Sequence, residues 1–180
     1  MNFVQRITLY ILLTIAGISW IILSADPSVS SSSADLSAPQ VGFKAPDFTL
    51  KTEAGESYTL SELKGQAVLV NLWATWCRPC RAEMPAIQKI YDEYKDEGFI
   101  VLAVNMTVQD DPFNISPFVA EHNLNFPILL DITGDVGKAY QLRSLPSSFF
   151  INREGIISEV VIGGPMAEAL LRTRVEKILK

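Results

Sequence analysis

The sequence WATWCRPC, residues 73–80, stands at the boundary between two different hydrophobic patterns. Before it, residues 67–73 (AVLVNLW) form a nearly continuous apolar run, which is typical of a strand covered on both faces. After it, apolar residues recur every three or four positions, as in an amphipathic helix: Met84, Ile87, Tyr91 and Tyr94. The only two cysteines, Cys77 and Cys80, are therefore predicted to lie where a buried strand passes into a helix.

The start of a helix is a favourable position for a reactive cysteine. Only a thiolate attacks a disulfide, and the free N–H groups and positive dipole end of a helix stabilise that anion. A nearby cation acts in the same direction, and Arg78 and Arg81 both lie close to the cysteines in the sequence. We predict that Cys77, at the helix start, is the nucleophile, and that Cys80, one turn further in, resolves the mixed disulfide.

The spacing of the cysteines argues against two other roles. A disulfide between residues three apart closes a loop too short to stabilise much of the fold. A structural zinc site needs four ligands, and the only other strong soft or borderline ligand is His122, 45 residues after Cys77. His122 is predicted to be a capping or surface residue at a helix end, and no metal or other cofactor is expected.

The rest of the chain alternates strand and helix patterns. Strands are predicted at residues 46–50, 57–60, 99–104, 126–130, 148–152 and 157–162, and helices at 115–123 and 166–179. The first two strands flank a glycine-containing turn and are predicted to form a small hairpin. The alternation predicts an α/β sandwich with a central, mostly parallel sheet.

The N-terminus carries an uncharged apolar run at residues 7–23. As a helix this run would be ~26 Å long, just short of a ~30 Å hydrocarbon core. We predict an uncleaved signal anchor over residues 1–24, because the run is long for a signal peptide and large residues precede the candidate cleavage point; a cleaved signal peptide is the alternative. Residues 25–40 are rich in serine and predict a flexible linker, which leaves residues 41–180 as the folded, exported domain.

The overall charge excludes one class of function. The 180 residues include 15 Lys+Arg and 20 Asp+Glu, for a net charge of −5. Nucleic-acid binding driven by overall positive charge is therefore not expected. A hydrophobic content of 48% is sufficient for the core of one ordinary domain.

Several motifs around the cysteines match one family. WATWCRPC resembles the thioredoxin active-site signature, and RAEMP (81–85) resembles the helix segment that carries its kinking proline. The resemblance continues through APDFTL (45–50), NFPILLD (125–131) and GKAYQLRSLPSSFFINREG (137–155). With its anchor, the chain resembles the TlpA/ResA-like membrane-bound thiol:disulfide oxidoreductases. The resemblance implies a thioredoxin-like fold with a mixed, mostly parallel sheet flanked by helices, an N-terminal β-hairpin extension and a single transmembrane helix.

The same resemblance assigns roles around the dithiol. Pro146 corresponds to the cis-proline that faces the dithiol, and the backbone of Leu145 would pair with a substrate segment as an added strand. Trp76 would shape the substrate surface. Arg78 would lower the thiol pKa, select an acidic partner or simply point into water.

Two residues differ from ordinary thioredoxins. Asn71 stands where those proteins have a buried aspartate, and an amide cannot act as a proton-transfer base. Glu83, three residues after Cys80, resembles the active-site glutamate of the ResA-like branch and would exchange protons with the dithiol. A solvated Glu83 paired with a nearby arginine is the alternative.

The resemblance implies a reductase that acts on disulfides of exported proteins, such as apocytochrome c, and receives electrons from a membrane thiol donor. The alternatives are a disulfide oxidase or isomerase, and a reductase specific to sporulation or envelope proteins, because the direction of exchange depends on the reduction potential. A metal-delivery protein is less favoured, since its ligand set is not evident. Peroxide reduction is also disfavoured, because Asn71, Leu72 and Trp73 lack the proline of the peroxiredoxin motif.

Overall fold

The computed structural model describes residues 2, 5, 7, 13–14 and 36–180. The chain divides into two units, Met1–Ser32 and Ser33–Lys180, and the second carries the sheet and both cysteines. The predicted anchor over residues 1–24 and the linker over 25–40 lie, apart from a few positions, outside the described residues. Among the residues that are described, no helix has the length and hydrophobicity to cross a membrane.

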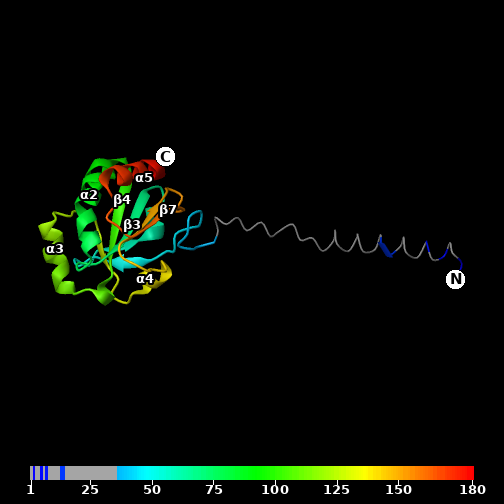
Figure 1. Cartoon of the computed structure of the whole chain (residues 1–180), viewed down its shortest axis with the longest axis horizontal. Coiled ribbons are helices and arrows are strands. Elements are labelled where there is room, and N and C mark those ends of the chain that lie inside the picture. The colour runs from blue at the N-terminus through cyan, green and yellow to red at the C-terminus, as the bar shows by residue number, and fades with distance from the viewer. Residues whose placement is uncertain (1, 3–4, 6, 8–12, 15–35) are drawn as a thin grey trace. The chain divides into compact units, whose positions relative to one another are not determined.

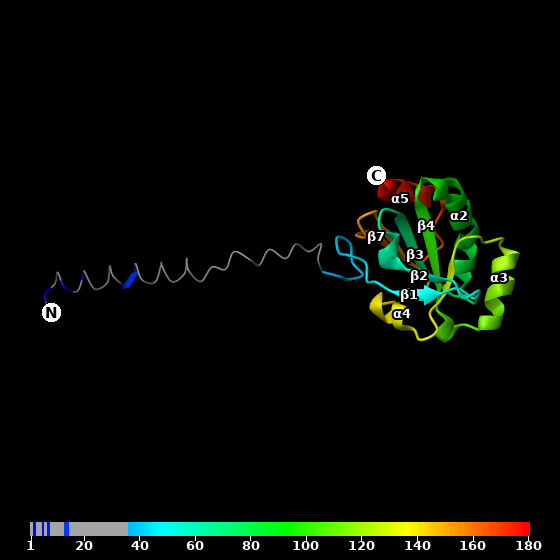
Figure 2. The ribbon, with the colours of Figure 1, turned by 180° about the vertical axis from the view of Figure 1, so that it is seen from behind.

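A five-stranded sheet forms the centre of the second unit, with strand order β5-β4-β3-β6-β7 (Figures 1 and 2). Its strands are β3 (Ala67–Trp73), β4 (Phe99–Asn105), β5 (Ile128–Leu130), β6 (Ser147–Ile151) and β7 (Ile157–Ile162). The pairs β3–β4 and β4–β5 are parallel, whereas β3–β6 and β6–β7 are antiparallel. A mixed sheet is therefore confirmed: β3, β4, β5 and β7 run in one direction and β6 runs against them, so most strands are parallel although two of the four neighbouring pairs are antiparallel.

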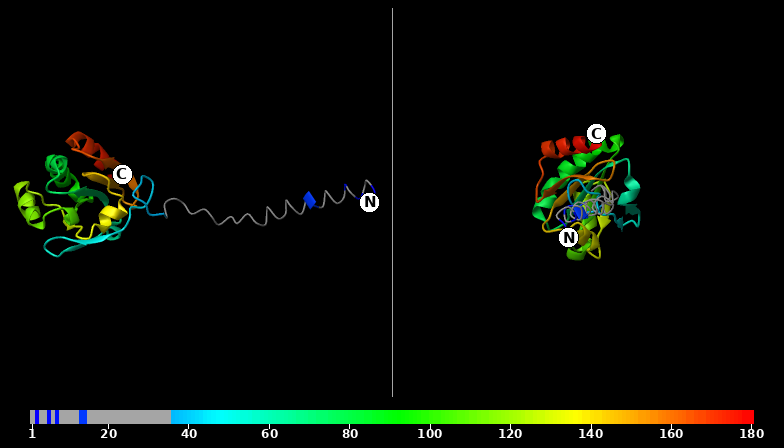
Figure 3. Two further views of the ribbon diagram at one scale, coloured as in Figure 1. Left: turned by 60° about the horizontal axis from the view of Figure 1, so that its bottom comes forward. Right: turned by 90° about the vertical axis from the view of Figure 1, so that its right-hand side faces the viewer.

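Helices cover both faces of this sheet. On one face lie α2 (Arg78–Tyr94), α3 (Ile115–Glu121) and α5 (Glu168–Leu179), whose buried side chains join one apolar core. Helices α2 and α5 pack against each other, and they lie side by side in both views of Figure 3. The other face is covered by α4 (Asp135–Ala139) and by the segment that contains β1 (Thr49–Lys51) and β2 (Ser57–Thr59).

The local patterns explain most of these elements. Strand β3 coincides with the predicted apolar run and is buried along its whole length. Strands β1 and β2 pair antiparallel, which confirms the predicted hairpin. The order of these elements and their layers define a thioredoxin-like α/β fold, in which β3 leads directly into the cysteine loop and α2.

Candidate active site

The two cysteines form a disulfide at the start of α2. Cys77 immediately precedes the helix, and its Sγ accepts a hydrogen bond of 3.3 Å from the backbone N–H of Cys80. Cys80 is fully buried, whereas Cys77 keeps 4% of its surface exposed. The helix start is thus where the sequence predicts it, and Cys77 is the more accessible of the two sulfur-bearing residues.

A carboxylate that sequence reasoning missed holds the cysteine loop against the end of β4. Asp110 accepts hydrogen bonds from the backbone N–H of Thr75 at 2.6 Å and from its hydroxyl at 2.5 Å. The same carboxylate accepts from the side-chain amide of Asn105, the last residue of β4, at 2.7 Å. Only the folded chain brings Asp110 and Thr75 together, because the two residues are 35 positions apart.

Trp76 is the most prominent apolar side chain on this loop. Trp76 is 59% exposed, yet its indole Nε1–H donates a 2.9 Å hydrogen bond to the backbone carbonyl of Gln109. The ring therefore has a fixed orientation while its surface faces solvent. Trp73, by contrast, is fully buried and packs on Phe118 with ring centroids 4.9 Å apart.

The two arginines near the dithiol have different surroundings. Arg81 donates to the backbone carbonyl of Thr75 at 3.3 Å, lies 5.0 Å over the Phe118 ring and pairs with Glu121 at 3.6 Å. Arg78 is exposed, and its side chain makes no hydrogen bond or ion pair with the described part of the chain. Arg78 is therefore the cation at this end of α2 that is free to contact a partner.

Glu83 lies on α2 one turn after Cys80 and is fully buried. Its Oε1 accepts from the side-chain amide of Asn71 at 3.0 Å, and its Oε2 accepts from the backbone N–H of Met166 at 3.1 Å. Burial raises the pKa of this carboxyl above its ordinary value, although the two hydrogen bonds act in the opposite direction. The alternative of a solvated Glu83 paired with arginine is therefore wrong.

Asn71 links Glu83 to the neighbouring strand. Besides its bond to Glu83, its Nδ2 donates to the hydroxyl of Ser148 on β6 at 2.9 Å, while its buried Oδ1 has no hydrogen-bond partner among the described residues. Ser148 gave no signal in the sequence, because its role depends on the antiparallel register that sets it opposite Asn71. The result is a polar group of three side chains from β3, α2 and β6 inside an apolar core.

The peptide bond between Leu145 and Pro146 is cis, as the family resemblance implied. Strand register pairs Ser147 with Leu72, so Pro146 precedes β6 at the end of β3 from which the cysteine loop leaves. A Cβ added at Gly164 would lie 2.7 Å from Glu83 Oε2 and 2.8 Å from Pro146 Cγ. Pro146 and the Glu83 carboxyl are therefore close neighbours, and only glycine leaves room between them.

His122 lies apart from this chemistry. It follows the last residue of α3, its Nδ1 is 3.0 Å from the carbonyl of Phe118, and its ring stacks on Phe118 at 4.2 Å. The prediction of a histidine at a helix end is confirmed. Within the described residues, His, Cys, Asp and Glu side chains form no group of three that would hold a metal ion.

A cysteine pair at a helix start, a neighbouring cis-proline and a mixed sheet with helices on both faces together define a thioredoxin-fold dithiol protein. Comparison with known proteins gives the same class. The model of the AhpC/TSA family matches residues 41–160, and the chain belongs to this family.

Named relatives agree on the chemistry. The chain is 42% identical over 125 residues to the thioredoxin-like protein YneN of Bacillus subtilis, which covers 69% of this chain and 72% of that one. It is 39% identical over 145 residues to the thiol-disulfide oxidoreductase ResA of Halalkalibacterium halodurans, covering 81% of each chain. The crystal structure of StoA from Bacillus subtilis matches with a TM-score of 0.62 and 32% identity, over 72% of this chain and 96% of that one. The protein is a thiol:disulfide oxidoreductase of this type.

Proposed function

We propose that the Cys77–Cys80 dithiol reduces disulfide bonds in exported proteins, with apocytochrome c as the leading substrate. The observation that carries this proposal is the buried Glu83 carboxyl, which shares α2 with the dithiol and lies beside the cis-Pro146 loop. A carboxyl group whose pKa is raised by burial is suited to accept and return a proton during thiol–disulfide exchange. A dithiol serving only as a structural crosslink would have no use for such a group.

The reaction follows from the positions of the two sulfurs. The Cys77 thiolate attacks one sulfur of the substrate disulfide, forms a mixed disulfide and releases the other substrate sulfur as a thiolate. Glu83 takes the proton from the Cys80 thiol, and the resulting thiolate attacks Cys77 Sγ. This step closes the Cys77–Cys80 disulfide and releases the second substrate thiol, so that two electrons pass from the enzyme to the substrate. A membrane thiol donor then reduces the enzyme disulfide.

The surface around the dithiol supports a polypeptide substrate. The backbone of Leu145, next to cis-Pro146, would pair with an extended substrate segment, and Trp76 and Arg78 would contact its side chains. Further exposed apolar side chains lie on neighbouring loops that follow β4 and β5, namely Val108, Phe113 and Ile132. Such a surface extends well beyond what a small thiol compound would contact.

We place this domain, residues 41–180, on the outer side of the membrane, held there by an anchor over residues 1–24 and a linker over 25–40. The uncharged run at residues 7–23 and the serine-rich segment after it support this arrangement.

The proposal is tested by trapping the substrate. In a Cys80→Ser variant the mixed disulfide through Cys77 cannot be resolved, so the substrate stays attached and is identified by mass spectrometry. We expect exported proteins with paired cysteines, apocytochrome c first among them, and no adduct with the Cys77→Ser/Cys80→Ser control. Recovery of no partner would contradict the reductase role. A dithiol potential near −120 mV, typical of the strongest oxidases, would reverse the direction.

A further inference from the structure

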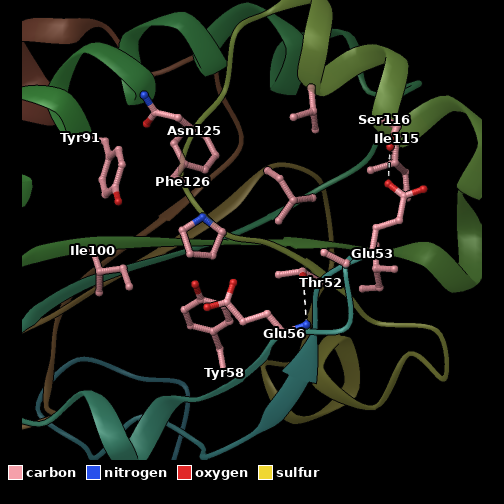
Figure 4. Close-up of a pocket in the computed structure, with 15 residues that line it drawn as sticks. Thr52, Glu53, Glu56, Tyr58, Tyr91, Ile100, Ile115, Ser116, Asn125 and Phe126 are labelled. Atoms are coloured by element: carbon pink, nitrogen blue, oxygen red, sulfur yellow. Dashed lines mark hydrogen bonds between the residues drawn. The ribbon is translucent and has the colours of Figure 1, made fainter.

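A second surface feature shares no residue with the dithiol site. A cavity of about 630 Å³ lies between the β1–β2 hairpin, the start of β4, helix α3 and the segment that leads into β5 (Figure 4). Its lining includes Glu53, Glu56, Tyr58, Tyr91, Ile100 and Ile128. The reaction proposed for the dithiol does not use this cavity.

The cavity follows the outer edge of the sheet. Strand β5 pairs only with Ala103–Asn105, so residues 99–102 of β4 have no outer neighbour in the described sheet. The carbonyl of Pro127 accepts from the N–H of Ala103, and the N–H of Asp131 donates to the carbonyl of Asn105, both at 3.0 Å.

Because alternate residues of a strand bond to opposite sides, the peptide groups of Ile128 and Leu130 point away from β4. No hydrogen bond connects these outward groups to another part of the described chain. Free N–H and C=O groups of this kind are a template for one more strand.

The walls of the cavity are mostly apolar and aromatic. Tyr91 comes from α2 and Tyr58 from β2, and Figure 4 shows them on different sides of the cavity, with Ile100 between them. All three side chains are only half-buried, whereas Phe126 next to them is buried. This environment suits the apolar side chains that alternate along one face of an extended peptide.

The charges at the cavity have one sign. Glu53 and Glu56 line it and are exposed, and no Lys, Arg or His is among the lining residues. Lys95 lies 5.8 Å from the ring of Tyr91, but it already pairs with Asp92 at 3.0 Å. Facing copies of this surface would bring four carboxylates together, which disfavours a second copy of the chain as the occupant.

We propose that this cavity binds an extended, basic segment of a partner protein, which adds as a strand to the free edge of β5. Its backbone pairs with the outward peptide groups of Ile128 and Leu130. Apolar side chains on one face enter between Tyr58 and Tyr91, and Lys or Arg residues lie against Glu53 and Glu56. This binding does not depend on the thiol chemistry.

A designed peptide tests the proposal on the full chain. The probe is the fluorescently labelled peptide Lys-Val-Lys-Phe-Lys-Val-Lys-Val, and its matched control has Glu in place of every Lys. We expect saturable binding by anisotropy, at least about tenfold weaker for the acidic peptide. The amide NMR signals of Ile128 and Leu130 should shift on binding. Equal affinity for the two peptides, or no shift at these amides, would overturn the proposal.

Two further comparisons separate strand addition from adsorption to an acidic surface. N-methylation of alternate peptide residues blocks hydrogen bonding along one edge of the peptide, so one methylated register should bind and the other should not.

Glu53→Gln/Glu56→Gln should weaken binding about tenfold, whereas the charge-matched control Glu62→Gln/Glu97→Gln, outside the lining, should not. Tolerance of both methylated registers would refute strand addition, and equal effects of the two double variants would refute binding at this cavity. A Cys77→Ser/Cys80→Ser variant should bind the peptide normally, even if the proposed reductase function is wrong.

Discussion

At the scale of single residues, the Glu83 carboxyl has two opposing influences on its protonation. Burial removes it from water and favours the neutral acid, whereas the hydrogen bonds from Met166 and Asn71 favour the anion. Burial is the larger effect, so the pKa of Glu83 is raised. The unpartnered Oδ1 of Asn71 leaves an acceptor nearby for a group that carries a proton.

Glu83→Gln should slow the step in which Cys80 resolves the mixed disulfide. The amide cannot take the thiol proton, and general acid–base catalysis by one side chain typically contributes ~10² to 10⁴ in rate. We expect a loss near the lower limit and a flatter pH profile, measured by stopped-flow release of a model substrate thiol. Glu62→Gln, which replaces an exposed acid outside the site, is the control. An unchanged profile would reduce Glu83 to a structural role.

The same substitution should change how stability depends on pH. Because the folded-state pKa of Glu83 is raised, the folded chain binds this proton more tightly than the unfolded chain. The resulting stabilisation is present below the unfolded pKa of ~4.3 and is lost as the pH rises through the folded value. Glutamine does not ionise, so the stability of Glu83→Gln relative to wild type should increase over that window. Urea unfolding from pH 4 to 8 measures this, and a constant difference would contradict it.

At the scale of elements, the apolar pattern was sufficient for the central strands. Strand β3 was predicted at 67–73 and observed there, because burial on both faces leaves an unbroken apolar run. Helix α2 begins at Arg78, directly after Cys77, which is where the sequence predicts the helix start, although its apolar period shows only from Met84 onward. Helix α4 was missed, since five residues are too few to show a helical period.

The sequence predicted only those residues of the candidate site that lie close together along the chain. Cys77 and Cys80 stand together in the sequence, and Glu83 follows on the same helix. By contrast, Asp110 and Ser148 reach the site through tertiary contacts over 35 and 77 positions, and nothing in their neighbouring residues indicates this. The cis bond before Pro146 was available from family resemblance alone, because only ~5 to 6% of such bonds are cis.

Removal of the Asp110 carboxylate should loosen the connection between β3 and α2. In Asp110→Ala, the N–H and hydroxyl of Thr75 and the amide of Asn105 lose their acceptor, and buried unsatisfied donors cost ~1 to 3 kcal/mol. We expect a loss of unfolding free energy in that range, measured by urea denaturation. Asp111→Ala, which removes an exposed carboxylate that bonds to Phe113 N–H, should cost less. Equal losses would show that Asp110 does not hold the loop.

At the scale of the whole molecule, the dithiol lies beside an apolar surface formed by loops of distant sequence origin. The exposed side chains of Trp76, Val108 and Ile132 follow β3, β4 and β5, whose parallel ends lie at one edge of the sheet. The backbone N–H of Val108 bonds to the carbonyl of Asp131 at 3.1 Å, which joins the loops after β4 and β5. A protein substrate would bury several of these side chains at once.

Trp76→Ala should therefore distinguish protein substrates from small ones. Truncation of a central aromatic contact commonly costs ~1 to 2 kcal/mol, or about tenfold in affinity. We expect KM for a disulfide-bonded protein to rise about tenfold, with little change for oxidised glutathione. Exposed Leu170 on α5 offers the matched control Leu170→Ala, which should leave both values unchanged. Equal effects of Trp76→Ala on both substrates would indicate a damaged dithiol.

The acceptor that orients the Trp76 indole is a main-chain carbonyl, that of Gln109. Every amino acid supplies this atom, so the ring would keep its orientation whichever side chain stood at position 109. The loop after β4 is consequently free to diverge in composition and alter partner preference while the tryptophan and the sulfur chemistry stay as they are. Selectivity and catalysis in this enzyme would thus evolve independently.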